Sequence, residues 1–551
     1  MSVFEKGPSV SKVITGGSLT FLLAMIAGVF AWIFGVTFTR EDIGLTREAY
    51  GIFITGQAVI VIIGCITFGV NQSIQKYVAE FLVTDKEKAE KYARNGVISI
   101  IIFALIACII LSISGIFLFP SNTLIGLSLI IIGPSLLIIS LKDGIIGNLA
   151  AIQRFDYVAV INASFSVGLF IVGIPIILFI IKPNSASPYT QLAPLTLLGL
   201  TCSYIIQVIV AGYYGRKSLP FNLRNLHKGS KDIRIMGKVF KYGLYCAIPT
   251  IILSGSILWI PALLISAFGG SAATGLFGVI VGYAFMILTI SFMGWPMISA
   301  VSEARAMGDQ KLIDDYFRNN FKSSFNFISL FLTIFVGLAG PILTIFHGSD
   351  YRLDGQIPFI ILAVGVAILA LEFISCTIVI GAGEGKKASI VFIIITLSEI
   401  ALTVLFLNVF PVAHYAAPCA ILISSLLMFP FIVKLLKFQT SVPFPRETLW
   451  KSSVSIIIAI GVGFLINYSF NNYFYSLIGI VIGGVVLAGM YILSMLLLAG
   501  YDDEDFEMIY DSLDTFKLGF LTRLIKSAEK LSQKSPFYKK KGDSNKLLKK
   551  E

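Results

Sequence analysis

Two polar stretches decide the fold: residues 84–95 read TDKEKAEKYARN, and residues 308–319 read GDQKLIDDYFRN. Asp85, Tyr92, Arg94 and Asn95 recur as Asp309, Tyr316, Arg318 and Asn319, always at an offset of 224 residues. The same offset relates YGIF at 50–53 to TGLF at 274–277. The chain is therefore an internal duplication, which in a membrane protein is typical of transporters with two lobes around a central path.

Composition places the duplicated unit in a membrane. The 551 residues are 56% hydrophobic and only 13% charged, with a mean hydropathy of +0.88. A membrane-spanning helix needs about 20 mostly apolar residues, and the chain contains about fourteen such stretches. We expect spans at residues 13–38, 49–75, 96–119, 124–141, 157–181, 194–214, 240–267, 274–300, 323–346, 356–382, 389–410, 414–436, 452–469 and 474–499.

Basic residues indicate the orientation, because Lys and Arg are retained on the cytoplasmic side of short loops. With a cytoplasmic N-terminus, the outer loops hold only Arg40, Arg47, Lys182 and Arg352 of the 42 basic residues. An even number of spans with both termini in the cytoplasm is therefore the prediction. The first apolar stretch lacks a clear cleavage site, so we expect it to remain as a span of a multi-pass protein of the cell membrane.

The offset predicts an all-α protein with two six-helix lobes related by an axis along the membrane normal, followed by two further helices. We expect an N-lobe at 1–214, a cytoplasmic loop between the lobes at 215–239 and a C-lobe at 240–436. Helices thirteen and fourteen follow at 437–500, and 501–551 form an amphipathic, basic cytoplasmic tail. Two such lobes rocking against each other would give alternating access.

Two segments around the repeated stretch resemble known signatures. Residues 69–80 (GVNQSIQKYVAE) and 295–303 (WPMISAVSE), each followed by Asp85 or Asp309, resemble helices two and eight of the polysaccharide and lipid-linked oligosaccharide flippases. Fourteen helices and a twofold six-helix repeat also match that family. The resemblance implies membership of the multidrug, oligosaccharidyl-lipid and polysaccharide exporter superfamily, with a polyprenyl-phosphate-linked sugar as the substrate.

The resemblance also implies cationic residues that hold the substrate phosphate. Known relatives place several of them on helix one, whereas here no charge lies between Lys12 and Arg40. The candidates for head-group binding are basic residues near the ends of the spans: Lys76, Arg154, Lys241, Arg305 and Arg40. Candidate polar lining of the cavity is Gln57, Asn71 and Gln72, although hydrogen bonds between helices would explain these side chains equally well.

Two acidic residues lie near the middle of predicted spans. Glu372 and Glu399 have no basic residue within their own spans, and an unpaired carboxylate at that depth costs at least about 2.5 kcal/mol. They are candidates for coupling transport to H⁺ or Na⁺. The alternative is a protonated glutamate that hydrogen-bonds to a neighbouring helix.

Enzymatic chemistry is not expected. The sequence has no nucleotide-binding loop, metal-ligand spacing or sugar-nucleotide motif in a suitable context, so we expect no catalytic residue, metal or cofactor other than a coupling ion. The expected partners are membrane lipids and the lipid-linked sugar, with glycan assembly enzymes as further candidates; nucleic acid is not expected, and we expect a monomer. The alternatives are a cation-coupled multidrug and toxin exporter, an integral glycosyltransferase or polysaccharide polymerase, and a scaffold without transport activity.

Overall fold

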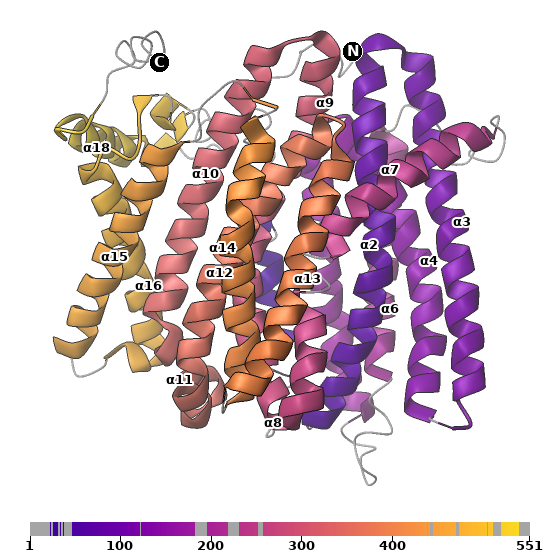
Figure 1. The fold of residues 1–551 in the computed structure, drawn as a ribbon, viewed down its shortest axis with the longest axis horizontal. Helices are drawn as coiled ribbons and strands as arrows, with labels where there is room; N and C mark the ends of the chain where they lie inside the picture. Colours follow the sequence, from indigo (N-terminus) through magenta and orange to yellow (C-terminus); the bar gives the residue numbers. More distant parts are fainter. Residues whose placement is uncertain are drawn as a thin grey trace.

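The helices of the chain run side by side as a bundle (Figure 1). A computed structural model describes residues 47–538, except for 122, 182–194, 219–230, 252–256, 411, 438, 441–444, 470–472, 504, 508 and 511–518. Before residue 47 it describes only residues 22–23, 26–30, 33–34 and 37, so the predicted first span and Arg40 fall largely outside the described residues. Among the described residues, nine helices are long and apolar enough to cross a membrane, or ten with one bent pair.

The first lobe consists of long, mostly apolar helices, and short turns join α2 to α3 and α4 to α5. Its helices are α2 (Arg47–Thr84), α3 (Lys86–Leu118), α4 (Thr123–Ala151), α5 (Phe155–Gly168), which continues through π-helical segments at Leu169–Gly173 and Ile176–Ile181, and α6 (Thr196–Ser218).

The second lobe repeats this arrangement with more breaks. Its elements are α7 (Ile233–Ile251), α8 (Ile257–Leu288), a 3₁₀ segment η6 (Thr289–Gly294), α9 (Met297–Met307), α10 (Gln310–Gly337), α11 (Ala339–His347), α12 (Ser349–Gly381), α13 (Gly385–Val409) and α14 (Ala416–Lys437). The chain then adds α15 (Arg446–Ser469), α16 (Leu477–Leu497) and a short amphipathic α18 (Thr522–Gln533).

The repeated stretch forms the same turn in both lobes. Asp85 caps α3 by accepting a hydrogen bond from the Lys88 amide at 3.0 Å, and Asp309 caps α10 through the Leu312 amide at 3.0 Å. Capping satisfies amides that a helix start leaves without a partner. Both turns lie at the same end of the bundle (Figure 1), which is called the elbow side below.

A second pair of turns extends the repeat. At the end of α4 the Arg154 amide donates to the Leu149 carbonyl at 2.9 Å, and at the end of α12 the Glu384 amide donates to the Val379 carbonyl at 3.0 Å. The residue before each donor is left-handed: Gly383 at φ +87° and Gln153 at φ +58°. The offset between the two turns is therefore six residues longer than at the elbows.

Several predicted boundaries need correction. The fourth span was expected to end at residue 141, but α4 continues to Ala151 and carries Lys142 and Asp143 with it. The turn expected between 267 and 274 lies inside α8. The predicted eighth span is interrupted by η6 before α9 begins, where Pro296 occupies the N-cap and lacks an amide donor.

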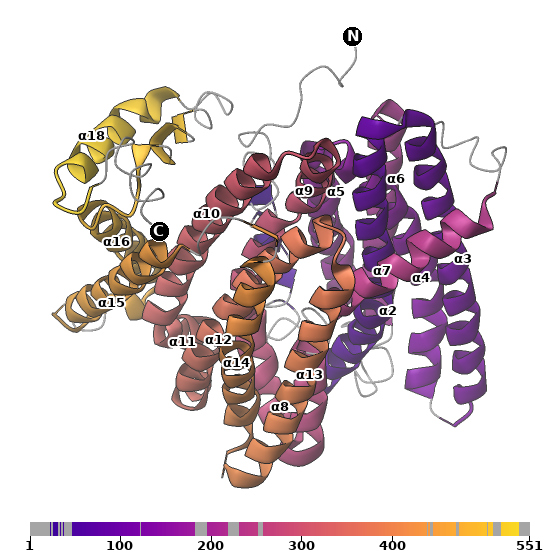
Figure 2. The same ribbon diagram turned by 45° about the horizontal axis from the view of Figure 1, so that its top comes forward.

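Helix α7 packs against the first lobe, although it opens the second half of the sequence. Figure 2 shows it crossing α2 obliquely. Glycines bring the two helices together: a Cβ added to Gly69 would lie 2.4 Å from the Ala247 nitrogen, and one added to Gly243 would lie 2.6 Å from the Val70 Cα. Such contacts between backbones are the usual role of small residues between membrane helices.

Candidate functional site

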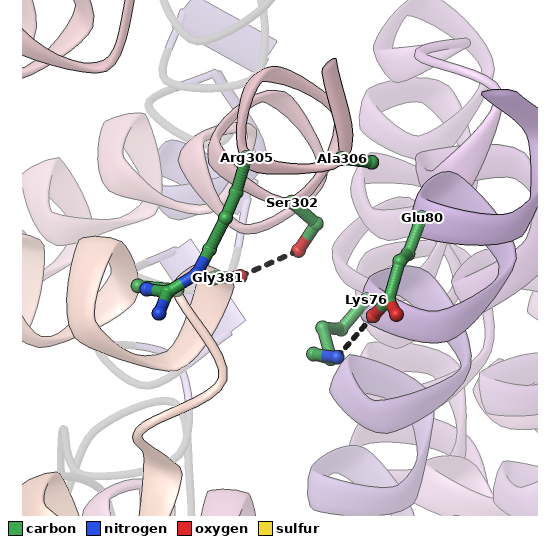
Figure 3. A pocket seen from close by; sticks show the side chains of 7 residues that line it. Lys76, Glu80, Ser302, Arg305, Ala306 and Gly381 are labelled. Atoms are coloured by element: carbon green, nitrogen blue, oxygen red, sulfur yellow. Dashed lines mark hydrogen bonds and ion pairs between the residues drawn. The ribbon is translucent and has the colours of Figure 1, made fainter. Parts of the chain in front are cut away.

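A cavity of about 170 Å³ lies between the two lobes near the elbow side. Helix α2 contributes Lys76 and Glu80, and α9 contributes Ser302 and Arg305. Gly381 and Ala382, at the end of α12, complete the wall together with Ala306. Figure 3 shows Lys76 and Arg305 reaching toward this space from opposite lobes. The structure therefore brings together two of the five predicted head-group cations.

The two cations differ in how they are held. Lys76 forms an ion pair with Glu80, and its ammonium lies 4.2 Å from the ring centroid of Tyr77. Its side chain is only 11% exposed. Arg305 donates to the Gln439 side-chain oxygen at 3.1 Å, a neutral partner that leaves its charge unbalanced by this contact. Arg305 is thus the cation of the cavity better suited to meet an anion.

Gln75, which directly precedes the cavity residue Lys76, joins the two lobes by hydrogen bonds. Its amide nitrogen donates to the Trp295 carbonyl at 3.1 Å and to the Ser299 hydroxyl at 3.4 Å. Gln75 and Ser299 are separated by 224 residues, the offset of the repeat. Equivalent positions of two repeats can touch only near the axis that relates them, so this bond marks the pseudo-twofold axis.

A second bond between the lobes comes from Gln153, the left-handed residue after α4. Its amide nitrogen donates to the Glu303 carboxylate on α9 at 2.7 Å. At the equivalent turn of the other lobe a glycine, Gly383, adopts the left-handed conformation. A left-handed backbone is unfavourable for glutamine by about 1 kcal/mol, so Gln153 is a strained residue that contacts the opposite lobe.

The other predicted cations do not line this cavity. Arg154 forms a two-point ion pair with Asp156, at 3.0 and 2.8 Å, and stacks on Tyr157 with its guanidinium carbon 3.6 Å from the ring centroid. Lys241 lies exposed on α7. Arg40 lies outside the described residues, and Gln57 falls on α2 but its side chain is not among those described.

Asn71 and Gln72 are fully buried on α2. Among the described residues, neither side-chain amide has a hydrogen-bond partner. Unpaired buried amides are rare and call for an explanation such as water, an ion or a ligand. A Cβ added to Gly147 would lie 3.1 Å from the Asn71 side-chain oxygen, which places Asn71 against α4.

One buried polar group was missed at the sequence level. The Thr67 hydroxyl donates to Asp143 at 2.6 Å, and the Lys142 ammonium lies 2.8 Å from the same carboxylate. The Asp143 side chain is 2% exposed and that of Lys142 is 14% exposed. The sequence signal was available, because two adjacent charges directly follow the predicted end of the span; placing that end at 141 assigned them to a loop.

Glu372 on α12 and Glu399 on α13 are both fully buried. Among the described residues, no hydrogen-bond partner reaches either carboxylate. Neither lines the cavity between the lobes. Glu372 lies eleven residues before the left-handed turn residue of its lobe, as Lys142 does in the other lobe. Equivalent positions of the two lobes therefore carry opposite charges.

Comparison with known proteins supports the fold. No family model and no curated relative matches the chain. Among solved structures, it resembles MATE in the straight conformation, with a TM-score of 0.61 and 16% identity over 79% of this chain and 96% of that one. It also resembles an outward-facing multidrug resistance MATE family transporter of the MOP superfamily, with a TM-score of 0.63 and 17% identity over the same shares.

A third similar structure is a MOP superfamily transporter from Pyrococcus furiosus, described as having a binding pocket of reverse polarity that suggests a different function. It has a TM-score of 0.58 and 16% identity over 78% of this chain and 94% of that one. The chain thus has the fold of these transporters.

Proposed function

We propose that this chain is a membrane transporter in which the two lobes move against each other, so that a path between them opens alternately to either side. The observation that carries the proposal is the pairing of Gln75 with Ser299 on the pseudo-twofold axis. It joins equivalent positions of the two lobes near the elbow side, where the bond from Gln153 to Glu303 also links them. The fold shared with MATE transporters supports the same conclusion.

The comparisons favour an organic compound as the substrate, exported in exchange for a cation. One of the similar structures is a multidrug resistance transporter. A cation-coupled multidrug and toxin exporter is also one of the alternatives that the sequence leaves open. Glu372 and Glu399 are the candidates for H⁺ or Na⁺ coupling, because a buried carboxylate without a partner is costly unless it binds a proton or a cation.

A second candidate, flipping of a polyprenyl-phosphate-linked oligosaccharide, is favoured by two specific observations. Lys76 and Arg305 line one cavity between the lobes; Glu80 pairs with Lys76, and Arg305 brings a cation that suits a phosphate or pyrophosphate group. In addition, α15 and α16 extend the chain beyond the twelve helices typical of multidrug and toxin exporters.

Reconstitution into liposomes separates the two candidates. A fluorescent lipid-linked oligosaccharide and an organic cation such as ethidium would be offered to the same preparation, and Arg305→Ala would be assayed beside Lys311→Ala as an exposed control. An exporter moves ethidium alone, and a flippase moves the lipid-linked sugar and loses that activity in Arg305→Ala only. Movement of neither compound, in protein that remains folded, would count against both candidates.

The coupling role is tested with Glu372→Gln and Glu399→Gln. Glutamine keeps the shape of the side chain but cannot take up a proton or balance a cation. We expect at least one variant to transport independently of the pH or Na⁺ gradient. Unchanged gradient dependence in both variants would remove these residues from the coupling mechanism.

A further inference from the structure

The segment after α16 is fastened to the bundle by a buried ion cluster. Lys322 of α10 places its ammonium 2.7 Å from the Asp502 carboxylate and 2.5 Å from that of Asp505. The Asp502 amide donates to Asp505 at 2.7 Å, and the Asp505 amide donates to Asp502 at 3.1 Å. The Lys322 side chain is 11% exposed, so the ammonium is largely removed from water.

Further hydrogen bonds fix which side of α18 faces the bundle. The Ser532 hydroxyl donates to the Tyr501 carbonyl at 3.2 Å, and the Ser535 hydroxyl donates to the Leu497 carbonyl at 2.7 Å. Tyr510 donates to Glu529 at 2.6 Å, which uses the acidic residue of α18 for an internal contact. Ser532 is fully buried. The docked face of α18 therefore combines the buried Ser532 with the partly buried Ile525, Ala528 and Leu531.

The exposed face of α18 is mainly cationic, with exposed apolar side chains at its start. Phe520, which precedes α18 in the 3₁₀ segment Gly519–Leu521, and Leu524 are 76% and 64% exposed. The exposed cations of this region are Arg523, Lys526, Lys530 and, just past the end of α18, Lys534. The helix lies across the elbow-side ends of α15 and α16 (Figure 1). An amphipathic helix with this distribution of residues is typical of segments that lie in a membrane surface.

An aromatic contact places the same region at the level of the lipid head groups. Trp450, in the first turns of α15, packs edge-on against Phe537 at 6.3 Å between ring centroids and is 43% exposed. Tryptophan is enriched at the boundary between hydrocarbon and water. If the partner were a soluble molecule, Phe520 and Leu524 would face water beside the membrane until it bound. A lipid leaflet covers both residues and balances the cations.

We propose that the outward face of α18 binds anionic lipid head groups of the elbow-side leaflet, and that the cluster of Lys322, Asp502 and Asp505 couples this surface to α10 of the C-lobe. Each basic residue near an anionic leaflet contributes about fivefold in affinity. The surface is therefore a lipid-dependent anchor for the C-lobe, independent of what the protein transports.

The test uses the full chain in nanodiscs of phosphatidylcholine, alone or mixed with phosphatidylglycerol in equal parts. The rate at which proteinase K removes the segment after α16 is measured by mass spectrometry. We expect phosphatidylglycerol to slow the cleavage at least about tenfold at low salt and less at high salt, because salt screens exposed charges. The variant Arg523→Gln/Lys526→Gln/Lys530→Gln should keep the wild-type rate in phosphatidylcholine and lose the slowing.

The coupling is tested with Lys322→Ala, for which we expect faster cleavage in both lipids, and with Lys311→Ala, an exposed residue of the same helix, as the matched control. Asp502→Asn perturbs the cluster more gently, should Lys322→Ala fail to fold. Equal cleavage with and without phosphatidylglycerol, or an unchanged lipid effect in the triple variant, would overturn the lipid surface. Wild-type cleavage in both Lys322→Ala and Asp502→Asn would overturn the coupling.

Discussion

At the scale of single residues, Lys142 and Asp143 show how the fold accommodates charge at membrane depth. The pair is buried on α4, and the Thr67 hydroxyl on α2 satisfies the carboxylate further. At the equivalent position of the other lobe, Glu372 has no partner among the described residues. One lobe therefore neutralises its buried charge within itself, while the other leaves a carboxylate available to bind a proton or cation.

Removing one charge of the Lys142–Asp143 pair should destabilise the protein more than replacing both residues by uncharged ones. We expect Lys142→Ala to destabilise the protein by about 3–5 kcal/mol, because it leaves the Asp143 carboxylate buried without a cation. The double variant Lys142→Met/Asp143→Asn should recover much of that loss. Equilibrium unfolding in mixed detergent measures both. Additive losses in the double variant would show that the two side chains do not interact.

At the scale of elements, the contact between α2 and α7 depends on glycine. Gly69 and Gly243 allow the two backbones to touch, and together they attach the first helix of the second half to the first lobe. Gly64 lies on the same helix, but an added Cβ there would meet nothing within 4 Å. Replacing Gly69 by alanine therefore changes both packing and helix propensity, whereas replacing Gly64 changes helix propensity alone.

We expect Gly69→Ala to destabilise the protein by about 1–3 kcal/mol through overpacking. Gly64→Ala should be neutral or stabilising by up to about 1 kcal/mol, because alanine favours a helix more than glycine does. Thermal unfolding of the two purified variants makes the comparison. Equal melting temperatures would show that α7 moves aside, and that the contact does not constrain it.

The docking of the segment after α16 should depend on pH through Asp505. Burial raises the pKa of Asp505 to about 6, although Lys322 opposes the shift. For Asp502 burial also favours the neutral form, but Lys322 outweighs it and lowers the pKa. An undocked Asp505 would titrate near about 3.9. Because the docked carboxyl binds its proton more tightly, docking should weaken as pH rises through about 6.

A spin label at Ser527→Cys, in a background without native cysteines, reports this docking. We expect the label to become more mobile between pH 5 and pH 8. The same label in Asp505→Asn should show no such change, since the titrating group is gone. Equal pH dependence in both proteins would assign the effect to another group.

At the scale of the whole molecule, the two lobes are joined near the elbow side by Gln75 and Gln153. In the proposed cycle both bonds break when the cavity opens on that side. The two cations of the cavity and the Gln75–Ser299 bond lie on short stretches of α2 and α9, the two copies of one repeated segment, and Gln153 reaches α9 from the turn after α4. The repeat therefore brings gating and substrate binding to the same interface.

Linking the lobes at the axis should stop transport. With the six native cysteines replaced, Gln75→Cys/Ser299→Cys treated with a short bifunctional thiol reagent should lose nearly all transport of whichever substrate the liposome assay identifies. Cleaving a reducible linker should restore it. Each single variant with the same reagent is the control. Full activity in quantitatively linked protein would contradict the rocking mechanism.

The sequence by itself determined the membrane environment and the duplication, because apolar length and internal repetition can be followed along the chain. It also indicated that Glu372 and Glu399 lie near the middle of apolar spans. Only the tertiary structure decided that Lys76 and Arg305 share a cavity while Arg154 and Lys241 do not, and that α7 packs on the first lobe. The pairing of Gln75 with Ser299 and the cluster around Lys322 join residues distant in the chain. Such contacts depend on how helices pack in three dimensions, which hydropathy and spacing along one chain do not encode.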